Sequence, residues 1–226
     1  LRHCHTHGQP QVERALRVMD GAVLIVEAVA GVQAQTETVW RQASKYQLPG
    51  ILYVNKMDRE GADFEHAVST VHDRLGGNPI ICQHPLYNRA GIFVGSADLV
   101  SMMAVVHDQS DSLGLKPRRS PISHADAFDT QTFRDAGQTL ADVMAARERM
   151  LESIADVDDD LMDALLSGKD VDKASVQRAL RKAVHSRKAL PVLCGASLRN
   201  RGVPALLDAM VDYLPSPLDK STLTVH

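Results

Sequence analysis

The stretch that decides the fold is Ile51-Leu52-Tyr53-Val54-Asn55-Lys56-Met57-Asp58. It opens with apolar and partly β-branched residues, the composition of a strand that is covered on both faces. The polar tetrad Asn55 to Asp58 follows at once, so it lies at the carboxyl end of a buried strand. Because open α/β sheets bind their ligands at that edge, the tetrad is a candidate ligand site.

Each residue type in the tetrad suits a guanine base. Asp58 can accept two parallel hydrogen bonds, from the ring N–H and the exocyclic amine of guanine, which adenine cannot supply together. Asn55 can bridge between the purine and neighbouring loops, and the aliphatic stem of Lys56 can lie over the ring face. A wrong base leaves the acceptor unpaired, which costs about 2–5 kcal/mol. Taken alone, the four residues are also compatible with a charged surface turn.

The flanking sequence predicts alternating helices and strands. A helix is expected first, because apolar residues recur at helical spacing from Val12 to Met19 and the run ends at Asp20-Gly21. A buried strand over Ala22 to Val26 comes next. Further helices are expected over about 35–47 and 62–75, and further strands at 80–82 and 191–194. Such alternation gives a parallel sheet with right-handed crossovers, so we predict an α/β fold with a doubly wound parallel sheet.

Between about residues 77 and 188 the alternation stops, which indicates an inserted α+β subdomain. The stretch 108–126 contains two prolines and several serines, so we expect a loop there. Helical spacing returns over 139–154 and 174–184 and, after the strand at 191–194, over 203–214. We expect the apolar stripe of that last helix, which includes Leu207, Met210 and Val211, to pack in the core.

The composition limits the partners that bulk electrostatics could attract. The chain has 226 residues, of which 44% are apolar and 23% charged, and its formal net charge is −3. This charge predicts no affinity for nucleic acid. The longest mostly apolar run, residues 21–32, contains Glu27 and is shorter than the roughly 18–20 residues of a membrane span. Three scattered cysteines fit a reducing compartment rather than a disulfide framework.

Two clusters contain metal-ligand residue types. One, His3-Cys4-His5 with His7, could aim its histidines to one side of an extended segment and bind zinc, but no matching ligand pair follows. We therefore interpret residues 3–7 as part of a chain terminus that binds no metal. The other comprises the acidic residues 156 and 158–160, which lack the glycine and closing glutamate of a calcium loop. We interpret it as a solvated helix cap and predict no metal site.

A second strand end supplies a partner for the tetrad. The turn Gly195-Ala196-Ser197 follows the predicted strand at 191–194 and precedes a helix. In a parallel sheet the carboxyl ends of the strands meet at one edge. We therefore interpret this turn as the second half of a nucleotide site, the alternative being a plain strand-to-helix turn.

Three runs, residues 12–23, 30–43 and 54–64, resemble the GTP-binding domain of translation elongation factor G, and the similarity resumes from Leu190 to Asp219. The resemblance implies a P-loop-type GTPase domain. It implies binding of GTP or GDP through Asn55, Lys56, Met57, Asp58 and Ser197. It also implies that a backbone N–H of the second turn meets the guanine carbonyl oxygen, although Ala196 and Ser197 stand in the reverse of the family's usual order.

One element of that family has no counterpart here. No phosphate loop of the type Gly-x-x-x-x-Gly-Lys-Ser/Thr occurs in the 226 residues. We therefore expect a fragment truncated at its N-terminus, with Mg²⁺ bound only in the intact factor. The family's Asp-Thr-Pro-Gly-His motif aligns over residues 1–5, where only His5 agrees. No catalytic residue is assigned on that basis.

The expected domain division follows from the resemblance. Residues 1–76 form a partial GTP-binding domain without the phosphate loop and the first switch, and residues 77–188 form the inserted subdomain. Residues 189–214 supply the last strand and helix of the GTP-binding domain, and residues 215–226 form a linker toward a missing domain.

Three functional hypotheses remain open. The leading one is a GTPase translation factor that contacts ribosomal RNA and stalk proteins, in translocation or in ribosome disassembly with a ribosome recycling factor. We expect it as a monomer without membrane contact, in the mitochondrion or in a bacterial-type cytoplasm. The second is a non-hydrolysing pseudo-GTPase or stalk-binding module. The third is an adenine-nucleotide protein, against which Asp58 argues.

Overall fold

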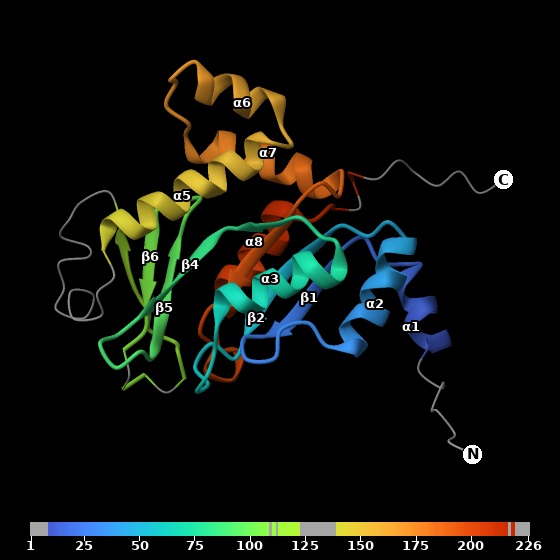
Figure 1. Ribbon diagram of the computed structural model, residues 1–226, viewed down its shortest axis with the longest axis horizontal. Helices are drawn as coiled ribbons and strands as arrows, with labels where there is room; N and C mark the ends of the chain where they lie inside the picture. Colours follow the sequence, from blue (N-terminus) through green and yellow to red (C-terminus); the bar gives the residue numbers. More distant parts are fainter. Residues whose placement is uncertain (1–8, 109, 112, 123–138, 217, 220–226) are drawn as a thin grey trace.

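The computed structural model describes residues 9–108, 110–111, 113–122, 139–216 and 218–219, and it contains two sheets (Figure 1). The first sheet has four strands in the order β1-β2-β8-β3, and each pair of neighbours is parallel. The second sheet is antiparallel, in the order β4-β5-β6-β7. The parallel sheet comprises β1 (Ala22–Glu27), β2 (Gly50–Asn55), β3 (Pro79–Ile81) and β8 (Leu190–Cys194), and the antiparallel sheet β4 (Gln83–Tyr87), β5 (Phe93–Asp98), β6 (Met103–Val106) and β7 (Arg118–Pro121).

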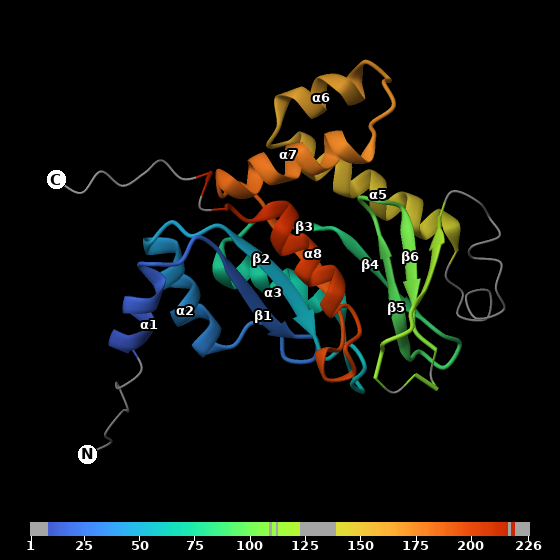
Figure 2. The same ribbon diagram turned by 180° about the vertical axis from the view of Figure 1, so that it is seen from behind.

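Helices cover both faces of the parallel sheet. On one face lie α2 (Ala34–Lys45) and α3 (Phe64–Leu75), with α1 (Gln9–Leu16) beside α2, and on the other lies α8 (Val203–Tyr213), as Figures 1 and 2 show from opposite sides. Strand β2 is buried on both faces, as predicted. Its Leu52 and Val54 pack in the same cluster as Phe64, whereas Ile51 and Tyr53 pack in the cluster that contains Tyr213.

Helix α3 shows how local sequence sets the bounds of an element. The Asp63 carboxylate accepts a hydrogen bond from the His66 N–H and caps the N-terminus. Gly76 ends the helix in the left-handed region, with φ 62°. The apolar residues at helical spacing, Phe64, Ala67, Val68 and Val71, are buried. The helix predicted after Gly61 is confirmed.

The inserted segment between β3 and β8 combines the antiparallel sheet with α5 (Leu140–Ala155), α6 (Asp159–Leu166) and α7 (Lys173–His185). Both helices predicted here are present, and α6 is an addition. Asp158 caps α6, so part of the acidic cluster is a helix cap, although this carboxylate is only 4% exposed rather than solvated. Strand β3 belongs to the parallel sheet. In that sheet it pairs with β8, and the predicted start of the insert at residue 77 stays a prediction.

The loop predicted over 108–126 is wrong in part, because β7 (Arg118–Pro121) pairs with β6. It is the edge strand of the antiparallel sheet, and an edge position tolerates proline since one row of backbone groups is not needed for pairing. Proline and serine content alone therefore misled the sequence interpretation. Helix α1 also ends at Leu16, earlier than the apolar spacing suggested.

Two apolar segments are more exposed than the sequence predicted. Strand β1 is an edge strand, and its Ile25 is 55% exposed. In α8 the side chains of Leu207, Met210 and Val211 are 56%, 37% and 79% exposed, so the expected core packing is wrong for them. Helical spacing identifies an apolar face but not what covers it. Among the described residues no helix is long and apolar enough to cross a membrane.

Candidate nucleotide site

The tetrad predicted from the sequence lies at the carboxyl end of β2. Asn55 is the last residue of that strand. Its Oδ1 atom accepts hydrogen bonds from the Lys56 N–H at 2.8 Å and from the Ser197 N–H at 3.0 Å. Ser197 follows β8, which pairs in parallel with β2, and Val54 is opposite Cys194. The fold therefore brings both predicted halves of the site to one sheet edge.

Lys56 and Met57 contribute to the site in different ways. Lys56 has a left-handed backbone, with φ 63°, which is uncommon outside glycine and asparagine. Its ammonium group forms an ion pair with Glu27 at the end of β1. The Met57 side chain is 2% exposed and packs in the core, while its N–H donates to the Gly195 carbonyl oxygen at 3.1 Å. Met57 thus braces the two loops through its backbone.

Asp58, the residue expected to select the base, forms an ion pair that the sequence did not suggest. Its Oδ2 atom is 3.2 Å from Nε of Arg199. The Asp58 side chain is 20% exposed and the Arg199 side chain 54%. Arg199 lies in the short 3-10 helix Ser197–Arg199, at the tip of the turn after β8. The carboxylate is therefore engaged by a cation from the opposite loop.

The turn after β8 is closed by its own backbone. The Ala196 N–H donates to the Arg201 carbonyl oxygen at 2.9 Å, and the Arg201 N–H donates to the Ala196 carbonyl oxygen at 3.1 Å. Gly195 has to be glycine, because a Cβ atom there would lie 2.1 Å from the Tyr53 hydroxyl and 2.2 Å from the Arg201 carbonyl oxygen. The reversed order of Ala196 and Ser197 keeps the backbone N–H of Ser197 facing Asn55.

Arg201 ties this turn to the antiparallel sheet. Its side chain is only 1% exposed, and its guanidinium donates to the Phe93 carbonyl oxygen of β5 at 3.1 Å. The Tyr53 hydroxyl in turn donates to the Arg201 carbonyl oxygen at 3.1 Å. Burial lowers the pKa of the Arg201 guanidinium, and the neighbouring Arg199 adds to this effect. The turn is therefore anchored on both sheets.

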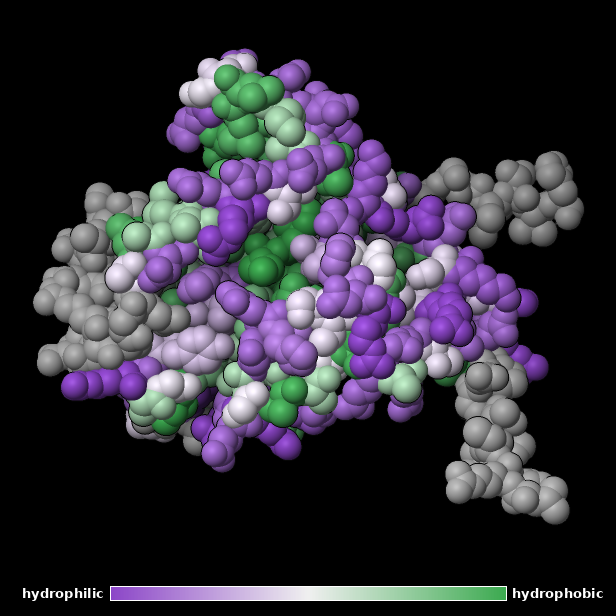
Figure 3. All heavy atoms as spheres, in the orientation of Figure 1, coloured by the Kyte–Doolittle hydropathy of each residue, from purple (hydrophilic) through white to green (hydrophobic). Residues whose placement is uncertain are grey.

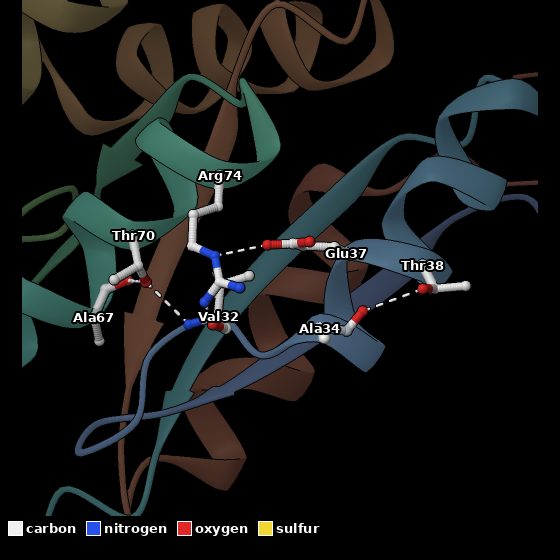
Figure 4. A network of polar contacts seen from close by, with 7 residues as sticks. All are labelled: Val32, Ala34, Glu37, Thr38, Ala67, Thr70 and Arg74. Carbon is white, nitrogen blue, oxygen red and sulfur yellow. Dashed lines mark hydrogen bonds and ion pairs between the residues drawn. The ribbon is translucent and has the colours of Figure 1, made fainter. Parts of the chain in front are cut away.

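The segment after β1 is bonded to the tetrad and to α3, and Figure 4 shows the contacts with α3. The Ala28 N–H donates to the Asn55 carbonyl oxygen at 2.9 Å. Further along, the Val32 N–H donates to the Thr70 hydroxyl at 3.0 Å. Arg74 reaches back from α3 to the Val32 carbonyl oxygen and to Glu37, the latter at 2.6 Å. These contacts hold the end of β1, and with it Glu27, next to Lys56.

Sequence reasoning missed three residues that build the site: Glu27, Arg199 and Arg201. Glu27 is the only charge in a mostly apolar strand, and the two arginines flank an asparagine in a turn, with Asn200 at φ 52°. Those features could have singled them out. His5 and the rest of the histidine cluster lie outside the described residues. Within the described part of the chain no group of three or more potential ligands could hold a metal ion.

Two cavities lie away from the tetrad. One, of about 270 Å³, is bounded by β5, β6, α7 and α8. The other, of about 470 Å³, lies between α3, β4 and α5 and is lined by Phe64, Ile81 and Met150. Figure 3, in the orientation of Figure 1, shows apolar side chains recessed among polar ones at the centre of the face turned to the viewer. Neither cavity touches the residues that the sequence assigned to nucleotide binding.

The structure combines a parallel sheet with an inserted antiparallel sheet, and the polar tetrad and the turn after β8 meet at two neighbouring strand ends. Together with the family match given next, these features define a GTP-binding domain of the translation-factor type. Residues 5–216 match the family model described as the elongation factor Tu GTP binding domain, so the chain belongs to that family.

The chain is also similar to the protein ttk003000868 from Thermus thermophilus, whose crystal structure is known. The two share 27% sequence identity with a TM-score of 0.73, and the match covers 92% of this chain. It covers 28% of the Thermus protein, so the chain spans less than a third of that protein's length.

Proposed function

We propose that this chain is the guanine-nucleotide-binding part of a translation factor that resembles elongation factor G. In the intact factor, GTP hydrolysis would drive ribosomal translocation or ribosome disassembly. The observation that carries this proposal is the hydrogen bond of the Ser197 N–H to Asn55, because it joins the tetrad and the second turn at one sheet edge. Membership of the GTP-binding family supports the same ligand.

Within this proposal each site residue has a role. Asp58 accepts hydrogen bonds from the ring N–H and exocyclic amine of guanine. Asn55 holds the two loops together, as it does through Oδ1 in the structure. The stem of Lys56 covers the base while its ammonium group stays paired with Glu27. Ser197 contributes through its backbone N–H, and Met57 through its bond to Gly195.

We propose that the chain comprises a partial GTP-binding domain, an inserted subdomain after β3, and the last strand and helix of the GTP-binding domain, β8 and α8. The exposed Ile25 of edge strand β1 and the exposed Val211 of α8 support an additional covering element. We propose that the strand and helix that carry the phosphate loop cover these two surfaces. That element would also supply the Mg²⁺ ligands, since the hydroxyl of a phosphate loop binds the ion.

The proposed partners follow from the family. They are ribosomal RNA and the ribosomal stalk proteins and, for the disassembly role, a ribosome recycling factor. The mitochondrion is the proposed compartment, with a bacterial-type cytoplasm as the alternative. A second candidate function is a stalk-binding module that binds ribosomal stalk proteins and hydrolyses no nucleotide.

Base recognition is tested by Asp58→Asn. In a version of the protein that includes the phosphate loop, the change turns one acceptor into a donor, so affinity for GDP should fall by at least about 30-fold, which corresponds to about 2 kcal/mol. Affinity for XDP should rise, because xanthine presents a carbonyl oxygen where guanine presents an amine. Titrations followed by NMR measure both nucleotides, and Asp73→Asn, an exposed change on α3, is the matched control. Unchanged GDP and XDP affinities in Asp58→Asn would reject the assignment.

Whether the protein has the phosphate loop needed for hydrolysis is tested separately from base recognition. Reading the transcript upstream of the Leu1 codon distinguishes the two candidate functions. A Gly-x-x-x-x-Gly-Lys-Ser/Thr pattern in the same reading frame supports the GTPase, and a complete reading frame without it supports the binding module.

A further inference from the structure

The ion pair between Asp58 and Arg199 places a competitor at the atom that would read the base. Nε of Arg199 lies 3.2 Å from Oδ2 of Asp58. The arginine is held there by its backbone, because its N–H donates to the Ala196 carbonyl oxygen at 3.0 Å and Asn200 then turns the chain with φ 52°. Its side chain remains 54% exposed, so it can swing aside.

Guanine and hypoxanthine differ in the number of carboxylate oxygens that they bind. Guanine presents two adjacent donors, the ring N–H and the exocyclic amine, and so needs both oxygens of Asp58. Hypoxanthine presents only the ring N–H and needs one oxygen. Arg199 holds Oδ2 and leaves Oδ1 without that contact. A base with one donor can therefore bind while the arginine stays, whereas guanine has to displace it.

We propose that Arg199 is a specificity-determining residue that competes with guanine for Asp58. This inference rests on the proposed function, since it assumes that Asp58 reads the base. Arg199 weakens guanine binding and leaves hypoxanthine binding nearly unchanged. It therefore reduces the difference in affinity between the two bases. Because the pair is exposed on the arginine side, the effect is modest, about two- to fivefold in affinity.

The experiment compares GMP with IMP, which differ only in the exocyclic amine, by NMR titration of the isotope-labelled chain. In Arg199→Ala, affinity for GMP should rise about two- to fivefold, while affinity for IMP should change by less than about 1.5-fold. Arg59→Ala is the matched control, because Arg59 is an exposed arginine next to Asp58 that has no ion pair among the described residues. It removes the same charge without the contact and should leave the GMP to IMP ratio unchanged.

Ionic strength gives a second test of the ion pair. Higher ionic strength weakens an exposed ion pair, and it screens the phosphates of GMP and IMP equally. The GMP to IMP affinity ratio of the unmodified chain should therefore rise with salt, and that of Arg199→Ala should stay constant. A lower GMP affinity in Arg199→Ala would overturn the proposal and assign Arg199 as a partner of the base. An unchanged ratio in both the variant and the salt series would overturn it as well.

A failure of this inference is distinguishable from a failure of the proposed function. Asp58→Ala should abolish the preference for GMP over AMP. If that preference is lost in Asp58→Ala while Arg199→Ala has no effect, only the role of Arg199 is rejected. If the unmodified chain binds GMP and AMP with equal affinity, base recognition by Asp58 is itself rejected, and the inference falls with it.

Discussion

The Ser197 N–H donates to Oδ1 of Asn55 at 3.0 Å, although 142 positions separate these two residues in the sequence. The same oxygen accepts from the Lys56 N–H, so one amide side chain holds the tetrad and the turn after β8 in a fixed relation. A buried or half-buried acceptor with two backbone donors is costly to remove, because both donors lose their partner.

Asn55→Ala should lower the free energy of unfolding by about 1–2 kcal/mol, because two backbone N–H groups lose their acceptor. Ser197→Ala should lower it by less than about 0.5 kcal/mol, since the donor at that position belongs to the backbone and survives the change. Denaturant unfolding of the two variants measures the difference. Equal losses would show that the Ser197 hydroxyl, rather than its N–H, stabilises the turn.

Gly195→Ala should be strongly destabilising, by about 2–4 kcal/mol. A Cβ atom at this position meets both the Tyr53 hydroxyl and the Arg201 carbonyl oxygen at little more than 2 Å. Adding Tyr53→Phe removes the first obstacle but not the second, so the double variant should recover only part of the loss. Thermal unfolding of the single and double variants tests this, and full recovery would mean that the Arg201 carbonyl moves freely.

The 226-residue chain by itself should show no measurable Mg²⁺-dependent GTP hydrolysis and at best weak nucleotide binding. Without a phosphate loop, the triphosphate loses its backbone donors, its lysine and the hydroxyl that binds the ion, and these groups supply most of the electrostatic stabilisation of phosphoryl transfer. A phosphate-release assay on the purified chain measures this. Turnover close to that of a complete translation factor would contradict the prediction.

The exposed apolar residues of β1 and α8 should bind an environment-sensitive dye and promote aggregation. Ile25 and Val211 are 55% and 79% exposed, and lysine at both positions should reduce dye fluorescence and raise solubility. Leu166→Lys serves as the control, because Leu166 is 78% exposed on α6, in the inserted part of the chain. If Leu166→Lys reduces dye fluorescence as strongly as the double change, the surface formed by β1 and α8 is not the dye site.

Asp158 should make stability fall in acid. Burial would raise the pKa of its carboxyl, but hydrogen bonds from Lys182 and from the Leu161 N–H outweigh burial and hold the pKa below its usual range. A carboxylate with a lowered pKa in the folded state contributes stability above the unfolded value near 3.9 and loses it as the pH falls through the folded value.

Replacing Asp158 should therefore make the free energy of unfolding depend less on pH in the acid range. Asp158→Asn should cost about 1 kcal/mol at neutral pH, since the amide is a fair helix cap but loses the Lys182 ion pair at 2.8 Å. Chemical unfolding of the variant and the unmodified chain at several pH values between about 7 and 3 measures the difference. A constant difference across that range would show that the Asp158 carboxylate does not titrate with folding.

Local sequence was sufficient for the elements whose signals are themselves local. The apolar run at Ile51 predicted β2, Asp63 and Gly76 bracket α3, and the tetrad after Val54 could be assigned to the carboxyl end of a strand. Each of these depends on residues a few positions apart, through side-chain alternation, capping and backbone conformation. The same holds for the two predicted helices of the inserted segment.

The tertiary structure decided which surfaces meet. Spacing could not show that the Val211 face of α8 is exposed, because a helical stripe carries no information about its cover. It could not show that residues 118–121 form an edge strand, since that depends on pairing with β6 across the intervening loop. The ion pair of Arg199 with Asp58 and the burial of Arg201 against Phe93 likewise arise only when β8 aligns beside β2. Such contacts join residues more than 100 positions apart, and only the pairing of distant strands and the packing of the two sheets bring them within reach.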